Sequence, residues 1–201
     1  MSHPDKPADR GLSRRALLAV SAALPLWLGG AGATAGVSTT SGADVAADRK
    51  KALLACLGGP WPAPCDLKPV VREVRRCEGY RLESVTYEVE PGDRVPAYVL
   101  VPDGVDASHP APAVAVWHQH NGAYHLGKVE PAGLAGSPMH HTGVALAKLG
   151  YVVICPDALC FGERQSPDLK GGDFERFEFL LYVVAGRCMA WKNILDHFPT
   201  A

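Results

Sequence analysis

The sequence predicts an α/β fold built on a mixed sheet, in which an antiparallel hairpin precedes a parallel strand-helix-strand unit. Two observations indicate this class. Segments 81–90 and 95–101 alternate or run apolar in the manner of strands and are joined by a turn that contains proline and glycine. Farther along, the apolar runs 113–117 and 151–155 flank a helix-like segment at 142–150. A helix between two apolar strands is typical of a parallel pair, and such sheets often keep an antiparallel edge.

Residues 1–35 have the pattern of an export signal and are set apart from the fold. An arginine pair, Arg14 and Arg15, precedes an apolar run, and small residues suited to signal-peptidase cleavage follow at 33–35. A membrane anchor is the alternative, but Pro25 interrupts the run, which is also shorter than the roughly 20 residues that a span needs. We therefore expect a twin-arginine-type signal, a periplasmic or extracellular location, and no stable membrane span once the signal is removed.

The rest of the chain suits one domain. Residues 1–35 hold four basic and two acidic side chains, so 16 basic and 19 acidic residues remain, a net charge of −3. This acidic balance argues against a nucleic-acid partner. We divide the remainder into a lead-in at 36–79, with a helix and a proline-rich loop, and a domain at 80–201.

The six cysteines match no zinc-ligand spacing. One disulfide among Cys56, Cys65 and Cys77 is compatible with the sequence, and so are buried, unreactive thiols throughout. Spacing alone does not choose between these arrangements.

The remaining elements follow from local pattern. Residues 44–57 predict an amphipathic helix that ends at a Gly-Gly-Pro sequence. Gly150 closes the helix predicted at 142–150. The last segment, 174–198, has apolar residues at unbroken steps of three and four, which predicts one continuous helix with a buried stripe.

A polar loop follows the apolar run 113–117. It consists of His118, Gln119, His120, Asn121 and Gly122. Loops at the carboxyl ends of parallel strands are where such folds bind ligands. Imidazoles two residues apart can chelate one metal ion, but no carboxylate or cysteine completes a ligand set, so we expect no metal and no cofactor. A non-catalytic, metal-binding exported protein that uses His118 and His120 is kept as the alternative.

This loop, together with segments 126–136, 150–153 and 156–164, resembles the amino-terminal half of the dienelactone hydrolase and acetyl xylan esterase branch of the α/β-hydrolase superfamily. The resemblance covers roughly residues 80–196. It implies a partial α/β-hydrolase fold and hydrolysis of a small-molecule or acylated-carbohydrate ester through an acyl-enzyme.

The resemblance also implies roles for the polar loop. Residues His118, Gln119, His120 and Asn121 would form the oxyanion or substrate loop. His120 is the best positional match for the residue whose backbone N–H binds the oxyanion.

The nucleophile that this family requires is missing. No G-x-S-x-G sequence occurs, and the acid and histidine would follow later still, so we expect the chain to be inactive by itself. Ser137 does not substitute, because Pro138 has no backbone N–H for the oxyanion. In this family the partner strand of 113–117 would also follow later, and the exposed strand edge should promote self-association.

Cys188 is the alternative nucleophile. It lies in a G-x-C-x-A sequence at 186–190, for which 180–184 would be the preceding strand. Its phase with the apolar stripe favours a buried helix thiol instead. Asp196 and His197 follow too closely to serve as the acid and base of this family.

Other charged side chains are expected to have structural roles. Asp157 should hydrogen-bond the turn after its strand, and Glu163 should pair with Arg164. Glu175 and Arg176, with Glu178, should form a solvated helix face.

Overall fold

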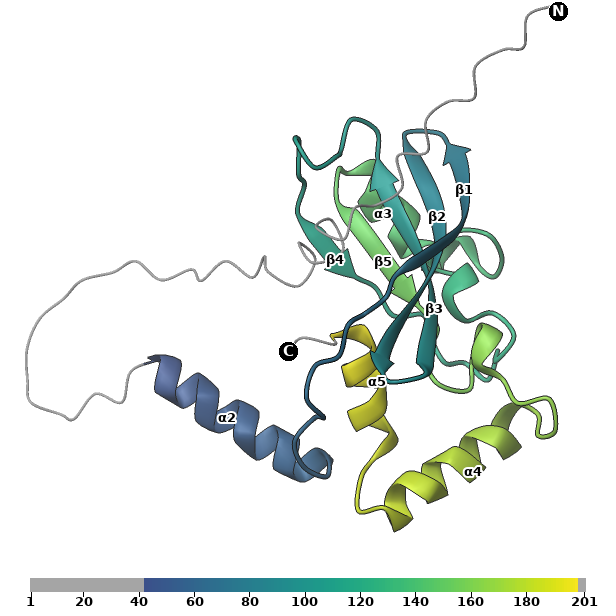
Figure 1. The fold of residues 1–201 in the computed structure, drawn as a ribbon. Coiled ribbons are helices and arrows are strands. Elements are labelled where there is room, and N and C mark those ends of the chain that lie inside the picture. Colours follow the sequence, from purple (N-terminus) through teal and green to yellow (C-terminus); the bar gives the residue numbers. More distant parts are fainter. Residues whose placement is uncertain (1–41, 199–201) are drawn as a thin grey trace, which may run out of the picture.

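A five-stranded mixed sheet organises the molecule, for which a computed structural model describes residues 42–198 (Figure 1). The predicted export signal at 1–35 lies outside the described residues. The elements in chain order are α2 (Gly42–Leu57), β1 (Val70–Cys77), β2 (Tyr80–Glu90), β3 (Asp93–Pro102), β4 (Ala113–Ala115), α3 (Thr142–Lys148), β5 (Val152–Pro156), α4 (Gly171–Val184) and α5 (Met189–His197).

The strand order is β1-β2-β3-β5-β4. Strands β1, β2 and β3 pair antiparallel, and β3 also pairs antiparallel with β5. Strand β4 pairs parallel with β5 and forms one edge of the sheet. The predicted mixed sheet, with an antiparallel amino-terminal hairpin followed by a parallel unit, is therefore confirmed.

Strand β1 was not predicted and lies inside the segment assigned to the lead-in. It pairs with β2 from Cys77 opposite Tyr80, across a turn in which Gly79 has a φ of +83°. Arginine and glutamate interrupt its valines, and most of its residues are exposed. An edge strand that is solvated on both faces has no alternating apolar pattern by which it can be recognised.

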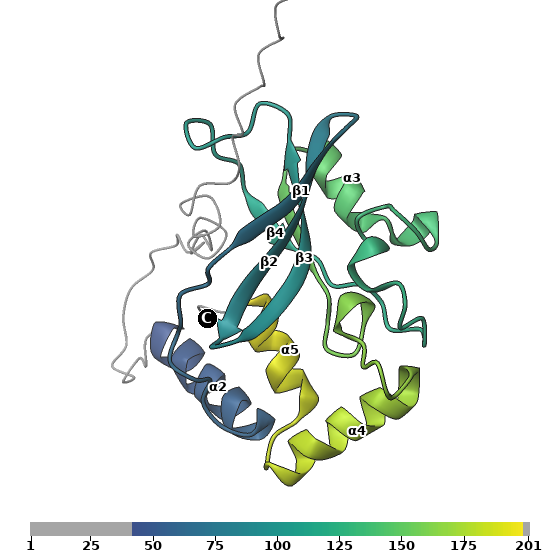
Figure 2. The ribbon, with the colours of Figure 1, turned by 45° about the vertical axis from the view of Figure 1, so that its right-hand side comes forward.

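The two faces of the sheet carry separate apolar clusters. Alternate residues of β2 and β3, among them Val85 and Ala97, pack against Trp191 and Leu195 of α5. The intervening residues, among them Leu100, pack against α3 on the other face. Side chains of consecutive strand residues point to opposite faces, so α3 and α5 lie on opposite sides of the sheet. In Figure 2, α3 lies beside the upper part of the strands, and α5 lies at their lower end near α2 and α4.

The prediction of one helix over 174–198 is wrong. Helix α4 ends at Val184 and α5 begins at Met189, with Gly186 at a φ of +73° and Cys188 extended between them. None of the residues of α4 is buried, whereas Trp191 of α5 is buried in the core. Steps of three and four continue across the break, so periodicity alone did not show that the chain turns there.

The break is held by the end of α2. The backbone N–H of Cys188 donates to the carbonyl of Leu57 at 3.0 Å. A Cβ on Gly58 would collide with the backbone at Gly186 and Arg187, so the close approach of the two segments requires glycine there.

Strand β4 is shorter than the predicted 113–117 and leaves Trp117 half exposed at 52%. Helix α4 also exposes apolar side chains, including Leu180 and Val184. Within the part of the chain that the structure describes, none of the helices combines the length and the apolar character that crossing a membrane requires.

Candidate active site

The loop that follows β4 lies beside the loop that follows β5, because the two strands are parallel neighbours. His118 joins them: its Nε2 accepts a hydrogen bond from the backbone N–H of Ala158 at 3.2 Å. Its Nδ1 lies 3.0 Å from the carbonyl of Gln119 and therefore carries the proton that donates to it. Burial lowers the pKa of His118, which agrees with a neutral ring in this position.

His120 is held by a residue far away in the sequence. Its Nδ1 accepts from the backbone N–H of Gly122 at 3.2 Å, so its Nε2 donates to Oε1 of Glu175 at 2.8 Å. The other oxygen of Glu175 accepts from the hydroxyl of Tyr124 at 2.6 Å. This hydrogen bond raises the pKa of Tyr124 to about 12. The expectation that Glu175 lies on a solvated helix face is wrong, because α4 turns this side chain toward the loop.

The rings of His118 and His120 both contact the ring of Phe161. The ring centroids of His118 and His120 lie 4.7 and 5.1 Å from that of Phe161, and the ring of Tyr124 stacks on Phe161 at 4.8 Å. The two imidazoles therefore share one support, but their ring nitrogens bind protein groups. Among residues 42–198, no group of three or more His, Cys, Asp or Glu side chains is placed to hold a metal ion. The described residues therefore give no support to the metal-binding alternative.

The backbone of the loop offers hydrogen-bond donors. Asn121 and Gly122 have φ values of +40° and +66°, which turn the chain sharply after His120. Within the described residues, the backbone N–H groups of Gln119, His120 and Asn121 donate to no protein acceptor. The loop therefore presents N–H groups to a ligand or to solvent at the carboxyl end of β4.

A buried ionic cluster fixes the neighbouring loops. Asp157, at the end of β5, accepts from the backbone N–H of Lys128 at 2.7 Å, from its Nζ at 2.6 Å and from the backbone N–H of Glu163 at 3.0 Å. Burial alone would lower the pKa of Lys128, but Asp157 and Glu163 raise it above its usual value. The expectation that Asp157 orders the following turn is confirmed. Gly127 and Gly162 leave room for it, since a Cβ on either would collide with its carboxylate.

The predicted pairing of Glu163 with Arg164 is wrong. Glu163 pairs with Lys128 and with Arg72 of β1. Arg164 donates instead to Asp196 of α5 at 2.6 Å. Glu163 therefore connects the loop after β5 to β1, and Arg164 connects it to α5. Strand β1 and the separate helix α5 were both unpredicted, so the sequence offered no signal for either pair.

The alternative nucleophile Cys188 has no catalytic surroundings. Residues 180–184 are helical, so the strand that a nucleophile elbow needs is not formed. Cys188 is not a buried thiol inside a helix either: it is half-buried and immediately precedes α5. Asp196 is paired with Arg164 and Lys192, and His197 is bonded to the carbonyl of Asn193.

The other candidate groups have structural surroundings. The backbone N–H of Ser137 donates to Glu130, in a turn followed by Pro138. All six cysteines are free thiols, so the disulfide considered among Cys56, Cys65 and Cys77 is not formed.

Comparison with known proteins gives distant relatives. No protein-family model matches the chain. Over 156 residues, 75% of this chain, it is 31% identical to a protein of Bacillus subtilis (strain 168) named "Putative hydrolase YtaP", of which it covers 48%. The crystal structure of a "putative acetyl xylan esterase" from Bacteroides fragilis matches with a TM-score of 0.58 at 20% identity, over 74% of this chain and 40% of that one. The chain thus spans about half the length of these relatives. The predicted resemblance is confirmed as a distant one, and the mixed sheet matches part of an esterase fold.

Proposed function

From this distant similarity to a hydrolase and the shared part of an esterase fold, we propose that the chain forms the amino-terminal part of an exported carboxylic ester hydrolase. The complete enzyme would act on a small-molecule or acylated-carbohydrate ester, in the manner of dienelactone hydrolases and acetyl xylan esterases. One observation supports this most: the loop after β4 is fixed in place while its backbone N–H at His120 is left without a protein acceptor.

The loop would bind the oxyanion of the reaction. Attack on an ester carbonyl places negative charge on oxygen, and a donor that is already oriented stabilises this charge without reorganising. His118 fixes the start of the loop through Ala158, and Glu175 fixes its middle through His120. Loss of one such donor costs other hydrolases about 10²–10³-fold in kcat. No cofactor is needed for this chemistry.

We propose that this chain does not hydrolyse esters by itself, because neither Ser137 nor Cys188 has the surroundings of a nucleophile. Sequencing the coding DNA beyond codon 201 tests the assignment to a hydrolase. We expect a further apolar strand, a nucleophile elbow of the G-x-S-x-G or G-x-C-x-G kind, and then an acid and a histidine. If the DNA beyond codon 201 encodes no such elbow in any reading frame, that result would argue against an esterase.

Export is proposed from the sequence pattern at 1–35. Replacing Arg14 and Arg15 by lysine should leave the protein in the cytoplasm with its signal uncleaved, because the twin-arginine export pathway recognises the arginine pair. Cell fractionation followed by amino-terminal sequencing measures both effects. Unchanged processing of the lysine variant would contradict the twin-arginine assignment.

Self-association is proposed from the open edge of β4. This strand ends the sheet, and Trp117 beyond it is 52% exposed. Exposed strand edges recruit other strands, so residues 36–201 should sediment as species larger than a monomer at micromolar concentration. A monodisperse monomer in sedimentation velocity would contradict this proposal.

A further inference from the structure

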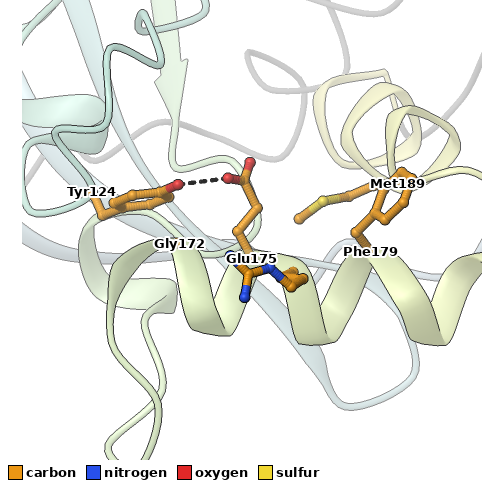
Figure 3. Close-up of a pocket in the computed structure, with 6 residues that line it drawn as sticks. Tyr124, Gly172, Glu175, Phe179 and Met189 are labelled. Atoms are coloured by element: carbon orange, nitrogen blue, oxygen red, sulfur yellow. Dashed lines mark hydrogen bonds between the residues drawn. The ribbon is translucent and has the colours of Figure 1, made fainter.

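A pocket of about 440 Å³ opens between α4, α5 and the turn that carries Tyr124. Figure 3 shows Tyr124 at one end of it, Glu175 in the middle and Phe179 with Met189 at the other end. Gly172 and Arg176 complete the lining. Its volume is within the range of small-molecule sites. The pocket adjoins the oxyanion loop through Glu175, but the proposed ester hydrolysis does not use it.

Two of its side chains, Phe179 and Met189, offer apolar surface. Phe179 is 47% exposed, so a ligand that covers its ring removes apolar area from water. Met189 is buried and packs with Cys160 and Phe161 beneath the pocket. Its thioether suits an aromatic partner. The body of a fitting ligand is therefore apolar or aromatic.

The two charged side chains of the pocket, Glu175 and Arg176, differ in how many hydrogen bonds they already make within the protein. Both carboxylate oxygens of Glu175 accept hydrogen bonds, one from Tyr124 and one from His120. Arg176 has only an ion pair with Asp173 at 3.5 Å, in which both side chains are about three-quarters exposed. Within residues 42–198, its guanidinium donates no hydrogen bond. Arg176 thus keeps the planar pair of donors that binds a carboxylate.

We propose that this pocket binds a small amphipathic carboxylate, with its apolar or aromatic body against Phe179 and Met189 and its carboxylate on Arg176. Binding of this kind needs no nucleophile, so it goes beyond the proposed ester hydrolysis and is tested independently of it. An inorganic anion alone would leave the apolar walls uncovered and should bind much more weakly.

Titration of residues 36–201 with phenylacetate, followed by NMR, tests the proposal. We expect saturable shifts at Gly172, Arg176 and Phe179, and binding about fivefold tighter than that of the neutral phenylacetamide. Inorganic phosphate should give no saturable shifts at these residues. The proposal is overturned if phenylacetate does not bind at this pocket, if the amide binds as tightly, or if phosphate binds equally well.

Two variants distinguish the contribution of the Arg176 charge to binding from that of the cavity itself. Arg176→Gln should reduce the affinity for phenylacetate to that for phenylacetamide, whereas Arg75→Gln, on β1, should leave it unchanged. Gly172→Leu should abolish binding of both ligands by filling the pocket. The fold should tolerate this leucine, because a Cβ at 172 meets only the Tyr124 hydroxyl oxygen at 3.4 Å and leucine favours helix. Undiminished binding in either Arg176→Gln or Gly172→Leu, with the fold intact by NMR, would contradict the assigned site.

Discussion

Replacing Asp157 by alanine should lower the free energy of unfolding by about 3–5 kcal/mol, the cost of removing one partner from a buried ion pair. The carboxylate of Asp157 is fully buried and accepts from the ammonium and backbone N–H of Lys128 and from the backbone N–H of Glu163. Without it, the ammonium of Lys128 stays buried with Glu163 as its one remaining carboxylate among the described residues. Urea denaturation at pH 7 measures the change.

A matched control is Lys148→Ala, which breaks an exposed pair with Glu78. Both side chains of that pair are about half or more exposed, so its loss should change the free energy of unfolding by less than about 1 kcal/mol. If Asp157→Ala is as mild as Lys148→Ala, then the buried cluster does not hold the loops after β4 and β5 together.

Acidification should destabilise the protein through His197. This ring is buried at the end of α5, and burial lowers its pKa to about 3. The unfolded chain binds a proton near pH 6.5 that the folded state does not bind until about pH 3. The stabilising contribution is therefore complete above pH 6.5 and is lost as the pH falls toward 3. Between pH 7 and pH 5 we expect a loss of about 2 kcal/mol.

The comparison of wild type with His197→Phe isolates this effect. Phenylalanine keeps a ring beside Trp117, whose centroid lies 4.7 Å from that of His197, and does not titrate. The change in free energy of unfolding between pH 7 and pH 5 should become smaller in the variant. The part that remains includes the contribution of His118, since burial lowers its pKa as well. An equal pH dependence in both proteins would show that His197 is not buried as a neutral ring.

Local pattern was sufficient to predict the hairpin β2–β3, the parallel pair β4–β5 and α3. In each case, the apolar period and the adjacent turn residues agree with the final packing. It failed at β1 and at the break before α5. There, the structure depends on contacts between distant segments, such as that of Leu57 with Cys188, which a local pattern does not contain.

The candidate site shows the same division. The position of the loop at the end of β4 follows from the abrupt change from apolar to polar residues after 113–117. The groups that fix it do not: Glu175 lies 55 residues beyond His120, and Ala158 lies 40 residues beyond His118. Glu175 occurs in a helix that looks solvated from its sequence, so only the packing of α4 against the loop shows its role.

We propose that this chain supplies an oxyanion loop without a nucleophile. Stopped-flow hydrolysis of p-nitrophenyl acetate by residues 36–201 tests it most directly, with Cys188→Ala as the matched control. We expect no burst of p-nitrophenol and identical slow rates for both proteins, because oriented N–H donors alone cannot form an acyl-enzyme. A burst stoichiometric with the protein, absent in Cys188→Ala, would contradict the account and identify Cys188 as the nucleophile.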